Sequence, residues 1–292
     1  MKSGRQTRRA DKIRYGLYVP NFGKGSYART LAELASDAED AGWEGFFLWN
    51  HLIDERNKRI PIVDPFVALA AIAMSTKRIR IGTTVTALPR YRPWIVARQA
   101  ATLDEMSNGR MILGVGLGFP TGLEFDMFSE NPDNKTRAEK LDEGLEVITG
   151  LWSGKPFSYQ GKHYQFKETV FLPTPTQKPR IPIWVGGFWP YKGPFRRAAK
   201  WDGVIPLKLP VRQPKPQDLR DVLAYIQSQR TNTAPFDVAV IGWGTGRNRV
   251  RDAKKIQPYV DAGITWWLES LYGMRDSPKD MRSRIRQGPP GI

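Results

Sequence analysis

Two histidines are the only side chains in this sequence whose ordinary pKa lies near neutral pH. They are His51 and His163, and the chain contains no cysteine. His51 follows residues 45–49, a short β-rich run, so it lies where a predicted strand ends. A histidine in that position can accept or donate a proton in a reaction. We therefore take His51 as the candidate acid–base group, with a purely structural bond to a loop carbonyl as the alternative.

Three glycine-rich segments also follow predicted strands. Residues 114–118 read GVGLG, where alternate glycines let a planar ligand approach the backbone, although a tight turn has the same pattern. Residues 185–188 read VGGF and precede a predicted helix, so their free N–H groups are expected to form a phosphate cradle. Residues 242–246 read GWGTG and are either a second such loop or a flexible turn.

The last predicted strand ends on a carboxylate, Glu269. It could serve as a base, but the chain is rich in arginine and we expect a structural ion pair instead. No metal site is expected, because the chain offers no thiolate and only two imidazoles.

Short β-rich runs alternate with amphipathic helical stretches along the whole chain. Eight strand–helix units in this order predict a parallel sheet with right-handed crossovers, and this number fits an α/β fold of the (β/α)8 TIM barrel type. A doubly wound open sheet is the alternative, but the first turn, 20–25, lacks its glycine spacing. The predicted strands are 13–19, 45–49, 79–86, 111–115, 183–185, 203–205, 238–242 and 265–268; the predicted helices are 30–41, 64–74, 93–105, 136–152, 194–200, 217–229, 251–262 and 278–285.

Residues 153–180 interrupt this alternation. They contain four prolines and five aromatic residues, and 157–166 alternates around Gln160-Gly161 as a hairpin does. We expect an excursion from the barrel here. The expected organisation is a basic tail, 1–12, followed by one barrel domain, 13–292.

The net charge of the 292-residue chain is +16, from 45 basic and 29 acidic side chains. Half of the excess lies in residues 1–14 and 275–292. A non-catalytic barrel that binds a polyanion through these ends is therefore one hypothesis, although no nucleic-acid motif accompanies the charge and nucleic acid is not an expected partner. The longest apolar run, 66–74, is too short to span a bilayer, so we expect a cytoplasmic protein without membrane contact.

Several motifs together resemble the bacterial luciferase-like superfamily, the flavin- and deazaflavin-dependent (β/α)8 barrels. The resemblance extends from about residue 13 to residue 269, and the ordered set of motifs is more specific than any single one. The motifs are GTTV at 82–85, ARQA at 97–100, LDEMSNGR at 103–110, GVGLG at 114–118, LDEGL at 141–145, LWSG at 151–154, GKHY at 161–164, PRIPIWVGG at 179–187, RRAA at 196–199 and WDGV at 201–204.

The resemblance implies where a coenzyme would bind. In this family a non-prolyl cis peptide at the end of the third strand supports one face of the flavin ring, which here corresponds to Thr84 and Val85. The phosphate lies on the backbone after the fifth barrel strand. The coenzyme-binding residues implied by the resemblance are Asn50, Thr84, Val85, Gly116, Leu117, Gly118, Gly186, Gly187 and Phe188, with His51 as the catalytic residue.

Two departures from the family pattern bear on the reaction. Asn50 stands where deazaflavin-dependent alcohol oxidisers have an aspartate before the histidine, so the histidine is kept and its acid is lost. Phe119 stands where sugar-phosphate-oxidising relatives have a glutamate, which argues for a small, apolar organic substrate.

The expected function is a monooxygenase-type oxidoreductase that uses reduced FMN, with a flavin reductase as a possible supplier and a homodimer as the expected assembly. A deazaflavin-dependent reductase or dehydrogenase that transfers hydride is the alternative. A protein that binds the coenzyme without turnover is a third possibility.

Overall fold

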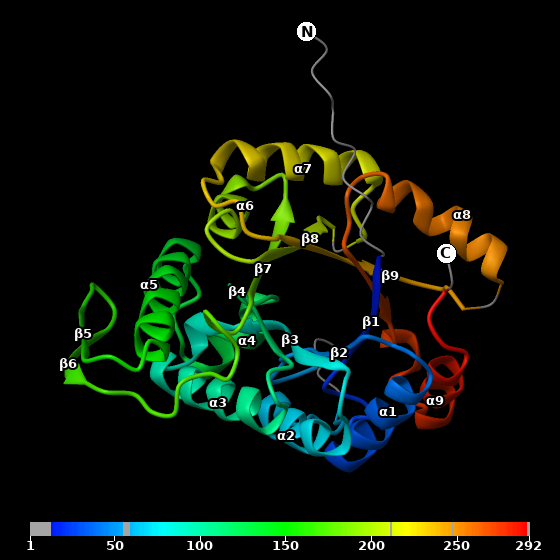
Figure 1. The fold of residues 1–292 in the computed structure, drawn as a ribbon, viewed down its shortest axis with the longest axis horizontal. Coiled ribbons are helices and arrows are strands. Elements are labelled where there is room, and N and C mark those ends of the chain that lie inside the picture. The colour runs from blue at the N-terminus through cyan, green and yellow to red at the C-terminus, as the bar shows by residue number, and fades with distance from the viewer. Residues whose placement is uncertain (1–12, 55–58, 211, 247, 291–292) are drawn as a thin grey trace, which may run out of the picture.

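The computed structural model describes residues 13–54, 59–210, 212–246 and 248–290. Eight parallel strands close into a barrel in the order β1-β10-β9-β8-β7-β4-β3-β2, and Figure 1 shows helices around this ring. The predicted barrel is confirmed, and the open-sheet alternative is wrong because β1 pairs with both β2 and β10. The barrel strands are β1 (Arg14–Val19), β2 (Gly45–Leu48), β3 (Arg80–Ala87), β4 (Met111–Gly116), β7 (Ile183–Trp189), β8 (Gly203–Lys208), β9 (Asp237–Gly242) and β10 (Trp266–Ser270).

Helices follow the strands where the apolar spacing predicts them. The helix α1 buries Leu31, Leu34 and Ala38 on one face, and α2 begins at Pro65 with the Asp64 side chain accepting the Val67 N–H at 2.9 Å. The helices are α1 (Ala28–Asp40), α2 (Pro65–Ser75), α3 (Pro93–Met106), α4 (Thr121–Glu124), α5 (Asn134–Trp152), α6 (Lys192–Ala198), α7 (Pro216–Gln229), α8 (Arg249–Val260) and α9 (Pro278–Arg286), with 3-10 turns η1 (Leu88–Arg90), η2 (Asp126–Phe128) and η3 (Tyr272–Met274). In the described ranges no helix is long and apolar enough to cross a membrane.

The predicted excursion is a two-stranded antiparallel hairpin, β5 (Phe157–Gln160) and β6 (Gln165–Thr169). Figure 1 shows it standing apart from the barrel beside α5. Its turn is fixed to α5 by Glu143, whose carboxylate accepts the backbone N–H groups of Lys162, His163 and Tyr164 at 2.9–3.1 Å. The hairpin therefore does not cover the barrel mouth (Figure 1).

Large side chains fill the inside of the barrel. Trp184, Trp266 and Phe47 contact one another with ring centroids 5.3–5.7 Å apart and are fully buried. At the amino-terminal end Arg14 stacks over Trp266 at 4.5 Å and pairs with Asp237. The interior is thus a packed core, and any site for a ligand of this barrel is expected at the carboxyl ends of the strands.

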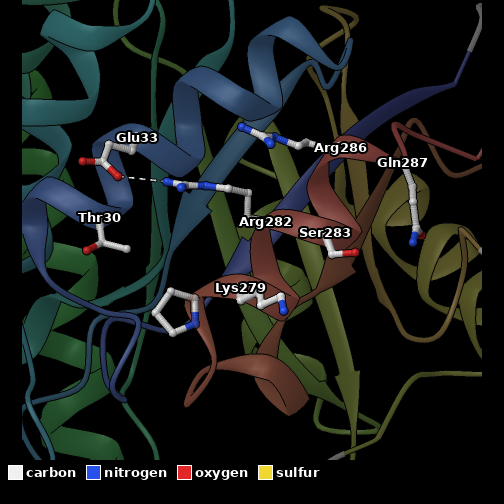
Figure 2. Close-up of a pocket in the computed structure, with 8 residues that line it drawn as sticks. Thr30, Glu33, Lys279, Arg282, Ser283, Arg286 and Gln287 are labelled. Atoms are coloured by element: carbon white, nitrogen blue, oxygen red, sulfur yellow. Dashed lines mark hydrogen bonds and ion pairs between the residues drawn. The ribbon is translucent and has the colours of Figure 1, made fainter.

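The basic carboxyl-terminal helix α9 packs against α1, and an open hollow of about 710 Å³ lies between them (Figure 2). Arg282 reaches Glu33 at 2.9 Å and Asp37 at 2.8 Å, and Arg286 reaches Asp37 at 3.0 Å. These ion pairs neutralise much of the positive charge expected to attract a polyanion at this end. The basic tail 1–12 lies outside the described residues.

Candidate active site

The backbone of His51 is held at the barrel mouth by an asparagine from the neighbouring strand end. Asn21 follows β1 and is fully buried. Its Nδ2 donates to the carbonyl oxygens of His51 and Val63 at 2.9 Å, and its Oδ1 accepts the His51 N–H at 3.1 Å. These three bonds fix the backbone from which the His51 side chain projects.

The His51 imidazole has a carboxylate partner that the sequence did not reveal. Nδ1 lies 2.7 Å from Oε1 of Glu124, at the end of the short helix α4, and Arg90 from η1 forms an ion pair with Oε2. The Glu124 side chain is 1% exposed and the His51 side chain 23% exposed, so His51 is the member of the pair that a substrate can reach. The expectation that this histidine lacks an acidic partner is wrong, because α4 supplies the carboxylate that position 50 lacks.

Asn50 is bonded to three side chains of the protein. Its Oδ1 accepts from Arg90 at 2.6 Å and from the Tyr91 hydroxyl at 3.0 Å, and its Nδ2 is 3.4 Å from Thr86 Oγ1. Asn50 therefore orients Arg90, which in turn holds Glu124. Its predicted contact with a coenzyme stays a prediction.

The end of β3 has the irregular backbone that the resemblance implied. The register against β4 shifts between Thr83 and Thr86, and the peptide bond between Thr84 and Val85 is cis. The Thr84 hydroxyl is buried and has no hydrogen-bond partner within the described residues. A buried polar group without a partner in the protein is a candidate to bond a ligand.

The side chain of Val85 explains why two of the predicted coenzyme-binding positions, 116 and 186, are glycine. A Cβ on Gly116 would lie 2.7 Å from Val85 Cγ2, and a Cβ on Gly186 would lie 2.8 Å from Val85 Cγ1. The side chain of Val85 therefore packs between β4 and β7, where only glycines leave room. This packing is one reason for glycine at position 116, and the predicted contact of Gly116 with a planar ligand stays a prediction.

The turn after β4 is held by Arg137 of α5. This buried guanidinium donates to the carbonyl oxygens of Leu117 and Gly118 at 2.7 and 2.9 Å and stacks over Phe125 at 4.7 Å. Gly118 has φ +86°, which requires glycine. The turn is thus rigid, and sequence reasoning gave Arg137 no role because its partners are backbone atoms.

The expected phosphate cradle differs in form from the prediction. Gly186, Gly187 and Phe188 lie inside β7, where they pair with Ile205–Leu207 of β8, and α6 begins only at Lys192. These three residues therefore do not provide the free N–H groups directly before a helix that the sequence predicted. Pairing with β4 ends at Val185, however. Among the residues that the structure describes, no strand pairs with 186–188 on the side of β4.

The loop at 242–246 is bonded to two carboxylates of the protein, which disfavours its use as a second phosphate site. The N–H of Thr245 donates to Glu269 at 3.0 Å, and the N–H of Gly246 donates to Asp252 at 2.7 Å. Glu269 also accepts the Trp267 indole N–H at 3.1 Å and lies 3.8 Å from Arg284. The structural ion pair predicted for Glu269 is confirmed, and two N–H groups of the loop are already bonded to carboxylates.

Aromatic rings line the mouth around His51. Trp49 stacks on Tyr272 with centroids 5.3 Å apart and planes 3° apart, and Phe22 meets His51 edge-on at 5.7 Å. Burial raises the pKa of Tyr18, which packs on Trp49, so its phenol stays neutral. Across the mouth, Phe119 contacts Phe188 at 5.4 Å.

The arrangement can therefore exchange a proton beside flat apolar walls. Within the part of the chain that the structure describes, no group of three or more His, Asp or Glu side chains is placed to hold a metal ion.

Known proteins resemble the chain in sequence. The model of the luciferase-like monooxygenase family matches residues 13–207. A F420-dependent glucose-6-phosphate dehydrogenase of Microbacterium testaceum is 34% identical over 154 residues, which cover 52% of this chain and 45% of that protein. The oxygenase component of a flavin-dependent trigonelline monooxygenase of Acinetobacter baylyi is 34% identical over 122 residues, covering 42% of this chain and 33% of that protein. The chain spans about half the length, or less, of these curated relatives.

Among solved structures, the coenzyme F420-dependent tetrahydromethanopterin reductase of Methanopyrus kandleri has the same fold. Its TM-score is 0.73 at 19% identity, over 95% of this chain and 97% of that one. The family match covers about two thirds of the sequence and includes the strands that carry His51, Val85 and Gly186. The chain belongs to the luciferase-like monooxygenase family.

Proposed function

We propose that this protein is an oxidoreductase that binds a deazaflavin coenzyme at the barrel mouth and transfers hydride between it and a small alcohol or carbonyl compound. The observation that carries the proposal is the His51–Glu124 pair, with a ring nitrogen 2.7 Å from a buried carboxylate. Hydride removal from an alcohol also requires a base for the hydroxyl proton, and hydride addition to a carbonyl requires an acid. His51 can serve in both directions.

Three features of the mouth fit a flavin or deazaflavin. Thr84 offers an unpartnered buried hydroxyl, the edge of Gly186–Phe188 past Val185 is open, and aromatic walls match a planar ring. When bound there, the coenzyme would supply two-electron chemistry that no side chain of this protein has. The residues proposed to hold it are Asn50, Thr84, Val85, Gly116, Leu117, Gly118, Gly186, Gly187 and Phe188.

The side chains around the substrate position have distinct tasks. His51 takes or gives the proton, and Arg90 pairs with Glu124. The aromatic side chains, with Phe119 in contact with Phe188, favour an apolar substrate. No carboxylate stands at position 119 to meet a sugar, so sugar phosphates are not the proposed substrates.

Two observations support deazaflavin over FMN: the similarity to an F420-dependent dehydrogenase, and Glu124 beside His51. The expectation of FMN rested partly on the absence of an acid beside His51, and Glu124 removes that argument. FMN with oxygen chemistry is the second candidate. It is supported by the similarity to a flavin-dependent monooxygenase component and by the apolar mouth, and it would call for a flavin reductase as partner.

A homodimer is proposed from the character of α2. This helix has no charged residue, and its outward side chains Val67 and Met74 are 66% and 71% exposed. A surface helix without a polar face is normally covered by another element. Because two copies of a chain with net charge +16 repel each other, they are expected to meet at an uncharged face.

An anaerobic assay separates the two coenzymes. The protein is mixed with secondary alcohols and with the oxidised form of F420, which is a deazaflavin coenzyme. Reduction of F420 is followed by absorbance. The proposal predicts reduction without oxygen that is lost in H51A. Turnover only with reduced FMN and oxygen would instead establish the monooxygenase, and no turnover with either coenzyme would contradict both.

A further inference from the structure

We propose that Glu124 is a positioning residue that fixes which ring nitrogen of His51 handles the substrate proton. The inference rests on the proposed function, in which His51 exchanges that proton. It concerns the ring itself: the carboxylate would hold a hydrogen on Nδ1, so that Nε2 is the nitrogen that gains and loses a proton.

The geometry leaves one hydrogen-bonding arrangement for the ionised carboxylate. Oε1 of Glu124 faces Nδ1 of His51 at 2.7 Å, and the Leu52 N–H approaches the same oxygen at 3.4 Å. Oε2 faces Arg90. An ionised carboxylate only accepts hydrogen bonds, so the contact with Nδ1 requires a hydrogen on that nitrogen. In a neutral imidazole the lone pair then lies on Nε2.

Arg90 supplies the charge that balances the carboxylate. The Arg90 side chain is 6% exposed and that of Glu124 is 1% exposed, so bulk water compensates neither charge. Burial disfavours the charged form of a carboxylate, and an adjacent guanidinium favours it. With Arg90 on Oε2, the charge of Glu124 is balanced before His51 is considered, and the imidazole does not have to carry a permanent positive charge.

An amide at this position would reverse the arrangement. Arginine has five donors and no acceptor, so in E124Q the single amide oxygen must face Arg90. The amide NH2 group then faces Nδ1, which has to accept. The hydrogen of the neutral ring moves to Nε2, and the base at that nitrogen is lost.

The chain provides a matched control in its other histidine. His163 Nε2 lies 2.9 Å from Oε2 of Glu139, on the β5–β6 hairpin away from the mouth. E139Q makes the same chemical change in a second histidine–glutamate pair. Because the chain has two histidines, the spectrum of the labelled protein contains two imidazoles, and H163A assigns them.

The test is nitrogen NMR of the full chain labelled with 15N-histidine, recorded above the titration of His51. The proposal predicts the Nδ1–H form of His51 in the unmodified protein and the Nε2–H form in E124Q. Alcohol-dependent reduction of F420 should fall by about 10²-fold or more in kcat in E124Q, with smaller changes in KM, because the wrong tautomer removes the base. E139Q should change the His163 signals alone and leave turnover as it was.

An Nε2–H form in the unmodified protein would overturn the positioning role, and this spectrum needs no variant. Unchanged kcat in E124Q despite the altered tautomer would overturn it as well. A failure of the proposed function looks different: no alcohol is oxidised, or H51A turns over normally, while the two tautomers are still as predicted.

Discussion

His51 and His163 provide an internal comparison at the scale of single residues. Both rings contact a glutamate oxygen, at 2.7 and 2.9 Å, but only His51 lies at the barrel mouth among Phe22, Trp49 and Tyr272. Contact with a glutamate therefore does not by itself identify a functional histidine. The position of the ring at the barrel mouth, among aromatic side chains, distinguishes His51 from His163.

Replacing His51 by alanine tests its role directly. Loss of general acid–base help should lower kcat by about 10²–10⁴-fold. Coenzyme affinity should change little, because the ring is proposed to meet the substrate proton. Steady-state rates and a fluorescence titration measure the two effects, with H163A as the control. Equal rates for H51A and unmodified protein would remove His51 from the mechanism.

The sequence could predict His51 but not Glu124. A histidine after a β-rich run can be recognised locally, because strand propensity and the following loop are both visible in the sequence. Glu124 lies 73 residues farther along, on a four-residue helix too short to show periodicity. Its role depends on the barrel bringing the ends of β2, β3 and β4 together. Long-range closure of this kind leaves no local signal.

At the scale of elements, β3, β4 and β7 are joined by the Val85 side chain. G116A would place a methyl group 2.7 Å from Val85 Cγ2, so the ends of β3 and β4 must move apart. We expect a loss of about 1–3 kcal/mol in unfolding free energy and weaker coenzyme binding. Urea denaturation and coenzyme titration measure these changes.

A second substitution checks the cause. V85A in the G116A background removes the colliding methyl groups and should restore most of the lost stability. If the double variant is as impaired as G116A alone, the collision with Val85 is not the reason for the glycine.

The start of β3 depends on a charged cap from α1. Burial works to raise the pKa of Glu39, but the backbone N–H groups of Ile79, Arg78 and Lys77 outweigh it, and the pKa is lowered overall. A lowered pKa in the folded state stabilises the protein above the ordinary glutamate pKa, and this stability is lost as the pH falls through the folded value. E39Q should therefore lower the urea midpoint at pH 7 more than at pH 3.5. An equal loss at both pH values would show that the charge of Glu39 does not matter.

Most elements could be predicted because their signals are local. Apolar spacing located α1, and the Asp64-Pro65 pair located the start of α2. The form of the Gly186–Phe188 segment could not be predicted in this way. Its residues continue β7 because β8 offers partners on one side, and the sequence does not show how far the neighbouring strand extends.

At the scale of the whole molecule, the positive charge is unevenly compensated. Arg282 and Arg286 are paired with acids of α1, whereas α2 carries no charge at all. We therefore propose that self-association uses α2 and that the basic helix α9 has a structural role. The contribution of the tail 1–12 stays a prediction.

Charges introduced on α2 should separate the dimer. V67E/M74E places two carboxylates on its exposed face, and burying them in an interface would be costly. Sedimentation velocity should show twice the 33.2 kDa chain mass for the unmodified protein and the chain mass for the variant. V250E, at a valine on α8 that is 68% exposed, is the control and should stay dimeric. A monomeric unmodified protein would refute the proposed interface.

The proposed coenzyme site is tested most directly by an anaerobic fluorescence titration of the unmodified protein and G186A with FMN and with F420, each oxidised and reduced. We expect saturable binding of F420 that is tighter than that of FMN. We also expect G186A to weaken this binding, because the added methyl group collides with Val85 at the mouth. Binding of neither coenzyme, or binding that G186A leaves unchanged, would contradict the assignment of the barrel mouth as the coenzyme site.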